Sequence, residues 1–439
     1  MIIAVRASQR LDSRGIPTVQ VEVETEFGIH RALVPSGAST GKHEAVELRD
    51  KVDGVYGGKG VGKAVRNVQE IIGPALVKRG FNPQTQLRDI DRFVRDLDGT
   101  PNKANLGANA ILGVSMACAR AGAASSGIPL YEFLRKEAGI EGPYVMLVPF
   151  LNVLNGGVHS GNTMAFQEMM IAAVGATSFE EAMRMGSEVY HRLKQAILDR
   201  YGAPATGIGD EGGFAPPVTL PEQALDLLAT AVADCGYSEQ VKFGIDPASS
   251  EFFRGDGSYD LGFKDKSPNI LSPADLQQLY NRLLAEYPIV LLEDPFAEDD
   301  WHTWAAFNKT CPVELVGDDL LVTNVERVRM ADSRKACNSM LLKVNQIGTV
   351  TEAIEAASFA FSLGWSVFVS HRSGETTDDF IADLTVGLST GHLKSGAPCR
   401  GERVVKYNRL VDIESELKAA GKTCLYAGAH FRFPSELSV

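Results

Sequence analysis

The stretch Ile289–Asn345, IVLLEDPFAEDDWHTWAAFNKTCPVELVGDDLLVTNVERVRMADSRKACNSMLLKVN, contains the same pattern three times. In each unit an apolar run ends at a charged residue, and a helical stretch leads to the next run. The charged residues are Glu293, Asp318 and Lys343, spaced 25 residues apart. A buried strand, a helix and two loops need about this length, and a continuous apolar run is typical of a strand covered on both faces. Charged residues at strand carboxyl ends line the active-site face of a βα barrel, so we expect these three side chains to meet there.

Two further apolar runs also end at a charged residue. The run 241–245 leads into Asp246, and the run 366–370 leads into His371. Lys394 follows 23 residues after His371. Any one of these charges could be a solvated loop residue. Six residues placed in the same way favour one shared face of a barrel instead.

The length and the pattern divide the chain in two. At 439 residues it is too long for one small core, so two domains are expected. Near the start, Val19, Val21 and Val23 alternate with polar residues, as in an antiparallel strand with one exposed face. We therefore predict an α+β domain with an antiparallel sheet over residues 1–140, and a catalytic α/β domain, a βα barrel, over residues 141–439.

The charge balance argues against polyanionic partners. The chain has 43 Lys and Arg against 55 Asp and Glu, a formal net charge of −12, and no basic block, so neither nucleic acid nor an anionic membrane is an expected partner. No apolar stretch approaches a membrane span, and Met1 begins a strand-like segment instead of a signal peptide, so a cytoplasmic location is expected. The 6 cysteines lie far apart without a CxxC pair, which favours reduced thiols.

The segment Ser36–Lys42 (SGASTGK) is similar to a phosphate-binding loop but lacks its spacing. Three residues separate its glycines, and His43 stands where the GxxxxGK[ST] motif needs a hydroxyl, so a nucleotide site is not expected. A Gly- and Ser-rich segment suits a mobile lid, and Ser39 could offer oxygen ligands to a metal ion. An ordinary flexible surface loop is the alternative.

Three motifs of the second domain add candidate site residues. His159 follows a pair of glycines (NGGVH), which would let the backbone approach a ligand closely beside an imidazole. Gln167 and Glu168 come shortly afterwards. The glycine-dense segment 207–217 carries Glu211, for which a turn with a solvated carboxylate is the alternative.

Asp246, Glu293 and Asp318 would supply three hard oxygen ligands from successive strand ends. This set, with no Cys or His beside it, suits Mg²⁺, which prefers carboxylate and water oxygens. Lys343 would lie against the metal. Nearby cations disfavour its charged form, so we expect Lys343 to act as a base near neutral pH.

The remaining polar residues suit an anionic substrate and a leaving group. Donors fit for a phosphate or carboxylate come from His371, Arg372, Ser373 and Lys394. Glu211 can act as a general acid if a second carboxylate, such as Glu168, raises its pKa. The predicted reaction is proton abstraction next to a carboxylate, followed by elimination.

Motifs along essentially the whole chain resemble those of the enolases (phosphopyruvate hydratases). They are LDSRG (11–15), VPSGASTG (34–41), LGANA (106–110), GDEGGFAP (209–216), LEDP (292–295), GDDL (317–320), LKVNQIGT (342–349) and SHRSGET (370–376). The resemblance implies a Mg²⁺-dependent lyase of glycolysis and gluconeogenesis that interconverts 2-phospho-D-glycerate with phosphoenolpyruvate and water. It also implies a homodimer, and a modified TIM-type barrel whose first strands and helices depart from simple alternation.

The resemblance, taken motif by motif, implies roles for single residues. Lys343 would be the general base and Glu211 the general acid, with Glu168 and His371 also in the catalytic set and Mg²⁺ stabilising an enolate-type intermediate. The first of two Mg²⁺ ions would be bound by Asp246, Glu293 and Asp318, and the second, arriving with the substrate, by Ser39. Substrate-binding residues would be His159, Gln167, Glu168, Glu293, Asp318, Ser370, His371, Arg372, Ser373 and Lys394.

Two other functions compete with this one. A barrel dehydratase acting on sugar acids would share the three carboxylates and the lysine but would not need the Ser39 loop with Arg372 and Ser373. A non-catalytic surface receptor or structural protein is the other. Family members that bind plasminogen are associated with a carboxyl-terminal lysine, whereas this chain ends in the residues 437–439, Leu-Ser-Val. Ile16, where the family usually has Asn, departs from the pattern without removing a catalytic group.

Overall fold

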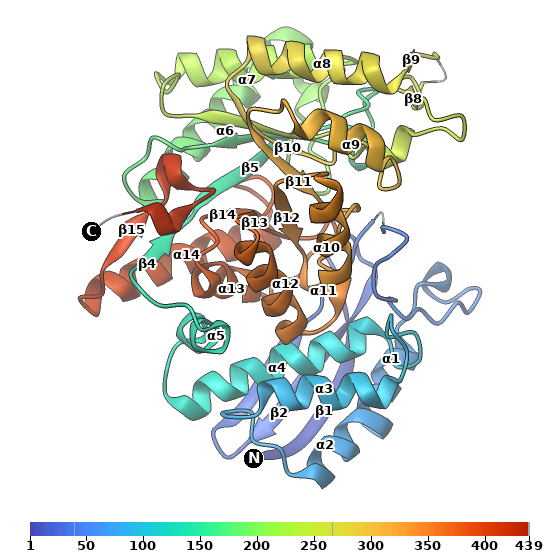
Figure 1. Ribbon diagram of the computed structural model, residues 1–439, viewed down its shortest axis with the longest axis vertical. Coiled ribbons are helices and arrows are strands. Elements are labelled where there is room, and N and C mark those ends of the chain that lie inside the picture. The colour runs from blue at the N-terminus through green and yellow to red at the C-terminus, as the bar shows by residue number, and fades with distance from the viewer. Residues whose placement is uncertain (39, 266, 438–439) are drawn as a thin grey trace.

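The computed structural model of the protein describes residues 1–38, 40–265 and 267–437 (Figure 1). Its amino-terminal part is a three-stranded antiparallel sheet, in the order β1-β2-β3, with helices packed against it. In chain order this part contains β1 (Ile2–Leu11), β2 (Pro17–Thr25), β3 (Gly28–Leu33), α1 (Gly62–Arg66), α2 (Gly73–Arg79), α3 (Leu87–Asp98), α4 (Ala108–Ser126) and α5 (Leu130–Ala138).

The buried face of the sheet packs against α4. Val19, Val21 and Val23 of β2 are fully buried, and Glu22 and Glu24 stay partly exposed, as the alternation predicts; Gln20, between the first two valines, is buried instead. α4 packs closely on the sheet at Gly113, where a Cβ atom would lie 2.5 Å from Val21 Cγ2. On its other sides α4 contacts α3, α5 and α12 (Val350–Ser362). It is therefore buried almost all round, which suits its many alanines.

The carboxyl-terminal part contains a closed barrel of eight strands in the order β10-β11-β12-β13-β14-β5-β6-β7. The strands are β5 (Val148–Asn155), β6 (Glu168–Ala172), β7 (Lys242–Asp246), β10 (Ile289–Glu293), β11 (Glu314–Gly317), β12 (Ser339–Leu342), β13 (Ser366–Ser370) and β14 (His392–Lys394). The three apolar runs before Glu293, Asp318 and Lys343 form the adjacent parallel strands β10, β11 and β12. The predicted fold class, a βα barrel with a smaller α+β domain, is confirmed. The domain boundary near residue 140 stays a prediction; it falls between α5 and β4 (Tyr144–Met146).

One strand of the barrel runs against the others. β6 is antiparallel to both β5 and β7, and only a short 3₁₀ turn, Gly157–His159, lies between β5 and β6. The helices α6 (Phe179–Tyr201) and α7 (Pro221–Asp234) both follow β6 instead. Because of this reversal, Glu168 at the start of β6 is in register with Asp246 at the end of β7. This is the departure from simple alternation that the resemblance implies.

The remaining helices surround the barrel (Figure 1). They are α8 (Pro273–Glu286), α9 (Trp301–Asn308), α10 (Val325–Arg334), α11 (Val344–Ile347), α12, α13 (Phe380–Leu388) and α14 (Gly401–Ala419). The side chains of Asp300, Asn324 and Thr349 accept hydrogen bonds from backbone N–H groups in the first turns of α9, α10 and α12, which fixes where these helices begin. In the described parts of the chain, no single helix is both long and apolar enough to span a membrane; α4 and α5 pass that test only as a pair bent by 103°.

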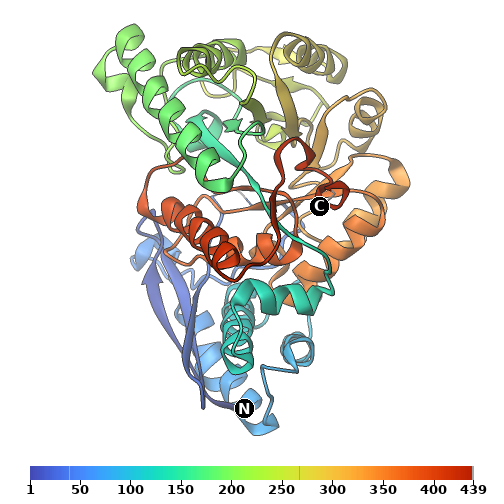
Figure 2. The same cartoon turned by 90° about the vertical axis from the view of Figure 1, so that its left-hand side faces the viewer.

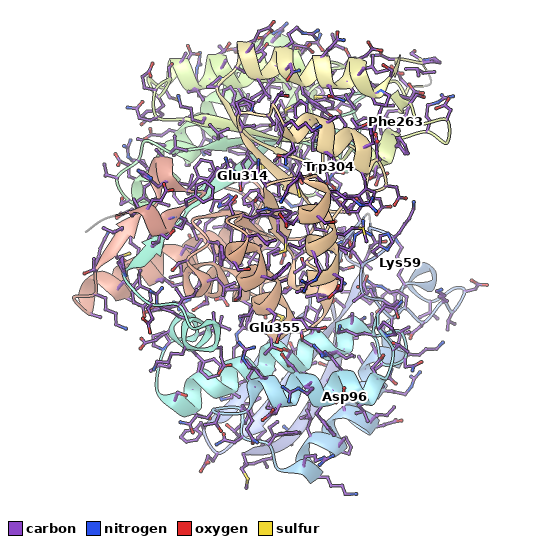
Figure 3. All side chains as sticks on the ribbon, in the orientation of Figure 1. Lys59, Asp96, Phe263, Trp304, Glu314 and Glu355 are labelled. Carbon is purple, nitrogen blue, oxygen red and sulfur yellow. The ribbon has the colours of Figure 1, made fainter. Side chains whose placement is uncertain are left out.

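The barrel contains a buried charged residue within a predicted apolar run. Glu314, labelled in Figure 3, lies at the start of β11 and is fully buried. Its Oε1 atom accepts hydrogen bonds from Ser339 Oγ (2.6 Å) and Ser366 Oγ (2.5 Å) and lies 3.0 Å from His392 Nε2. These partners replace the water that Oε1 loses on burial, whereas Oε2 has no hydrogen-bond partner among the described residues. The pattern of apolar residues alone therefore does not indicate this buried polar cluster inside the barrel.

The two parts of the chain join beside the carboxyl ends of the barrel strands. Ser36 and Gly374 exchange two backbone hydrogen bonds of 2.8 Å, so the loop after β3 is tied to the loop after β13. Arg120 of α4 forms a second tie, with its Nη1 atom 2.7 Å from Asp378 Oδ2. Figure 2 shows the amino-terminal part below the barrel. The loop that begins at Ser36 is thereby positioned next to the strand ends.

Candidate active site

One cavity lies at the carboxyl ends of the barrel strands. It is lined by Gly37, Glu44, His159, Gln167, Glu168, Glu211, Asp246, Ala248, Asp294, Asp318, Asp319, Lys343, Ser370, His371, Arg372, Ser373 and Lys394. The structure thus brings together all of the predicted site residues except two. Glu293 does not line the cavity but contacts Lys394, which does. Ser39, the predicted ligand of a second metal ion, lies outside the described residues.

Lys394 at the end of β14 gathers carboxylates from three other strands. Its Nζ atom lies 2.8 Å from Glu293 Oε1, 3.0 Å from Glu168 Oε2 and 3.4 Å from Asp246 Oδ2. Burial disfavours the charged ammonium, but these carboxylates outweigh it and raise the pKa of Lys394 well above its ordinary value. The surrounding carboxylates therefore favour the charged form of Lys394.

Asp246 and Glu293 are crowded by other carboxylates. Burial is the main cause that raises the pKa of Asp246 to about 6; Glu168 and Asp318 add to it, and Lys394 opposes it. Burial and Asp246 likewise raise the pKa of Glu293 well above its ordinary value. A divalent cation would relieve such repulsion, and hard carboxylate oxygens are the ligands that Mg²⁺ prefers. The donor chemistry of Asp246, Glu293 and Asp318 therefore fits Mg²⁺, but among the described residues these three are not a set with all ligand atoms within 4.8 Å of one another.

Lys343 at the end of β12 pairs with one of these candidate ligands. Its Nζ atom lies 2.5 Å from Asp318 Oδ2, and Gln346 Nε2 donates to Asp318 Oδ1 over 2.8 Å. Burial disfavours the ammonium, but Asp318 outweighs burial together with the cations Arg372 and Lys394, and the pKa of Lys343 is raised. The prediction that Mg²⁺ together with nearby cations disfavours the charged form stays a prediction: Arg372 and Lys394 act in that direction, and Asp318 opposes them.

Asp294 completes an acidic group that the sequence reasoning missed. Two sets of residues have potential ligand atoms within 4.8 Å of one another, namely His159, Glu168 and Glu211, and Asp294, Asp318 and Asp319. Asp294 Oδ1 and Oδ2 accept the backbone N–H groups of Asp318 (2.8 Å) and Asp319 (2.9 Å), which orients the segment after β11. Its φ of 37° is rare for a residue with a Cβ atom. The signal was the second acid of the LEDP motif.

Glu211 is held at one oxygen and faces two histidines with the other. Asn152 of β5, which is fully buried, donates from Nδ2 to Glu211 Oε2 over 2.7 Å. Glu211 Oε1 lies 3.4 Å from His159 Nδ1 and 3.7 Å from His371 Nε2. Burial and the Glu211 carboxylate raise the pKa of Glu168. Asn152 was missed because a single uncharged residue inside an apolar strand carries no sequence signal of its role.

The loop after Ser36 contacts the predicted anion-binding donors. Arg372 Nη1 and Nη2 lie 3.0 and 3.3 Å from the two carboxylate oxygens of Glu44, and Nη1 also donates to Asn345 Oδ1 over 3.1 Å. The backbone N–H of Ala38 donates to Ser373 Oγ over 2.6 Å. Glu44 is a further site residue that the sequence reasoning missed. Its contact spans 328 positions of the chain, so local pattern could not indicate it.

Two protein-family models match the chain. The model described as "Enolase, N-terminal domain" matches residues 2–134, and the one described as "Enolase, C-terminal TIM barrel domain" matches residues 143–435. The chain belongs to the enolase family. As an enolase-family protein with acidic residues grouped at the mouth of its barrel, it is a Mg²⁺-dependent lyase. The number of metal ions stays a prediction.

Proposed function

We propose that the protein reversibly dehydrates 2-phospho-D-glycerate to phosphoenolpyruvate, the reaction of phosphopyruvate hydratase in glycolysis and gluconeogenesis. One observation carries the proposal: Lys343, Glu211 and Arg372 line the same buried cavity. They supply a base, an acid and an anion-binding cation, which are the three groups that this elimination needs.

Lys343 takes the proton from C2 of the substrate, the carbon next to the carboxylate. Its Nζ atom must give up a proton beforehand, and the Asp318 carboxylate 2.5 Å away opposes that step. Mg²⁺, when bound, supplies positive charge that offsets Asp318 and stabilises negative charge on the substrate carboxylate. Lys394 provides a second cation, beside Asp246 and Glu293.

Glu211 gives its proton to the hydroxyl that departs from C3. Asn152 donates to Oε2, so this oxygen is already an acceptor. The proton therefore leaves from Oε1, the oxygen that faces His159 and His371. Glu168, whose pKa is raised by burial and by Glu211, lies in the same corner of the site.

Arg372 and Ser373 bind the phosphate. A guanidinium can form two parallel hydrogen bonds with phosphate oxygens, which a single ammonium cannot. A phosphate would compete with the Glu44 carboxylate for Arg372, and Ser373 Oγ could donate to it while still accepting from the Ala38 N–H. Substrate binding would thereby be coupled to the loop that carries Ala38 and Glu44.

The direct test is turnover of 2-phosphoglycerate by the purified protein with Mg²⁺. Formation of the enol phosphate is followed by its ultraviolet absorbance, and the product is identified by ³¹P NMR. A parallel panel of unphosphorylated sugar acids tests the other barrel dehydratase activity. No formation of phosphoenolpyruvate would contradict the proposal, and turnover of a sugar acid alone would replace it.

The proposal includes a cytoplasmic homodimer. Figure 2 shows the three strands β1 to β3 at one edge of the molecule, with the helices behind them. The side chains on this face carry both charges, in the pairs Arg6–Glu24 (2.6 Å) and Arg31–Glu22 (2.7 Å), so the face could pair with a second copy of itself. Sedimentation velocity tests this: a monomer at micromolar concentration would contradict it, and Arg6→Glu is expected to weaken a dimer that uses this face.

A further inference from the structure

Arg403 makes a direct contact with a catalytic histidine from outside the cavity. It belongs to α14 and its side chain is fully buried. Its Nη1 atom lies 2.6 Å from His371 Nδ1. Sequence reasoning did not single it out, and it does not line the cavity.

The backbone around the site holds Arg403 in place. Nη1 also donates to the carbonyl of Arg372 over 2.6 Å, and Nη2 donates to the carbonyls of Ser373 (2.6 Å) and Asp210 (3.0 Å). These acceptors lie on the loop after β13 and on the loop that carries Glu211. The guanidinium is therefore held by both of these loops.

A guanidinium has donors and no acceptor, and it keeps its charge in proteins. The ring nitrogen that it contacts must therefore present a lone pair, so His371 Nδ1 carries no proton. The remaining proton of the imidazole must then lie on Nε2. That atom is 3.7 Å from Glu211 Oε1 and, among the described residues, has no hydrogen-bond partner.

The charges around His371 also favour the neutral ring. The groups that act on it include Arg403, Lys394, Lys343 and Lys406, which are all cations. Burial is the largest cause that lowers the pKa of His371 well below its ordinary value, and these cations add to it. The Glu211 carboxylate is the opposing charge at Nε2.

We propose that Arg403 is a positioning residue that holds His371 in the neutral form with its proton on Nε2. His371 then presents its Nε2–H, 3.7 Å from Glu211 Oε1, as a donor to the group that occupies the cavity beside it. Its catalytic meaning, which rests on the proposed function, is that His371 orients the departing hydroxyl and Glu211 while Glu211 alone delivers the proton.

The tautomer is measured without substrate, so failure of this inference and failure of the proposed function are distinguishable. The full chain, labelled with [¹⁵N]histidine, is examined by long-range ¹H–¹⁵N NMR between about pH 6 and pH 9, the range in which an ordinary histidine titrates. His371→Gln identifies the signals among the 8 histidines. The expected result is an unprotonated Nδ1, a protonated Nε2 and no titration. A proton on Nδ1, or titration at an ordinary pH, would overturn the proposal.

Variants test the part played by Arg403. In Arg403→Met we expect the His371 signals to move toward a mixture of tautomers, whereas Arg403→Lys, which keeps a donor, should restore much of the Nε2–H form. The matched control is Arg135→Met, which removes another buried arginine that donates to backbone carbonyls, those of Gly142 and Pro143, far from the site. Unchanged His371 signals in Arg403→Met would overturn the proposal. If that variant does not fold, the wild-type and Arg403→Lys spectra decide, because a shift of Arg403→Lys to the Nδ1–H form contradicts it equally.

Discussion

Lys343 Nζ lies 2.5 Å from Asp318 Oδ2, so the proposed base and a proposed metal ligand share one hydrogen bond. The two functions are therefore linked: whatever draws charge from Asp318 also weakens its hold on the proton of Lys343. Substitution of either residue is expected to affect both metal use and proton abstraction, but not to the same extent.

Lys343→Ala should abolish exchange of the C2 proton of 2-phosphoglycerate with solvent, because the only proposed base is removed. We expect a loss of at least about 10²-fold in the exchange rate, measured by ¹H NMR in D₂O. Mg²⁺ binding, measured by calorimetry, should persist, since Asp246, Glu293 and Asp318 remain. Lys335→Ala, at an exposed lysine of α10's carboxyl end, is the control. Exchange that survives in Lys343→Ala would remove this residue as the base.

Glu211→Gln should slow elimination more than it slows C2 proton exchange. The amide keeps the shape of the side chain and its contact with Asn152 but has no proton to give to the leaving hydroxyl. Both rates are measured on one sample, phosphoenolpyruvate formation by absorbance and exchange by NMR. Glu355→Gln, at the exposed glutamate of α12 labelled in Figure 3, should change neither. Equal losses in both rates would reject this division of labour between Lys343 and Glu211.

Removal of divalent metal with EDTA should silence the enzyme until Mg²⁺ is added back. The reason is electrostatic: without a divalent cation, negative charge on the substrate carboxylate would build up among the buried carboxylates Asp246, Glu293 and Asp318. Asp246→Asn is expected to raise the Mg²⁺ concentration needed for half-maximal activity. Activity that persists in EDTA would contradict the metal assignment.

Asp91→Asn should change how stability depends on pH. Asp91 is fully buried in α3, and its Oδ2 accepts the backbone N–H of Thr351 at the start of α12 over 3.1 Å. Burial raises its pKa from 3.8 to about 6, so folding favours the neutral acid. Its contribution to stability is therefore full below about pH 4 and is lost as the pH rises through about 6.

Asparagine is neutral at every pH and keeps an acceptor for Thr351. Relative to wild type, Asp91→Asn should therefore gain up to about 3 kcal/mol of stability between about pH 4 and pH 8. Urea unfolding at several pH values measures this. The control is Asp89→Asn, at an exposed position of the same helix. Parallel stability curves for Asp91→Asn and wild type would contradict the prediction.

The barrel could be predicted because its strands are buried on both faces and end in charge. The continuous apolar runs before Glu293, Asp318 and Lys343 indicate short buried strands, and the charged residue after each run marks the end that faces the active site. The reversal of β6 could not be predicted from pattern, because its five residues, EMMIA, are all buried and a uniformly buried strand gives no sign of its direction. Only the enolase resemblance indicated that departure.

The candidate site divides in the same way. Charged residues that end an apolar run can be recognised in the sequence, and the structure places Asp246, Lys343 and Lys394 around one cavity. The raised pKa of Lys343 could not be predicted from the strand-end pattern, because it depends on one carboxylate 25 positions away. Asn152 and Arg403 were missed because their contact partners, Glu211 and His371, lie far from them in the sequence. Tertiary packing, not local sequence, brings such residues together.

The reversed course of β6 also sets a rule for recombining this enzyme with other barrels. In an ordinary βα barrel any strand with its following helix is an exchangeable module, because every module delivers its side chains at the same end. Here Glu168 reaches that end from the beginning of its strand, with β5 and β7 holding it from both sides. A chimera that exchanged β6 by itself for a forward strand would turn the carboxylate toward the opposite mouth, so β5, β6 and β7 must be transplanted together.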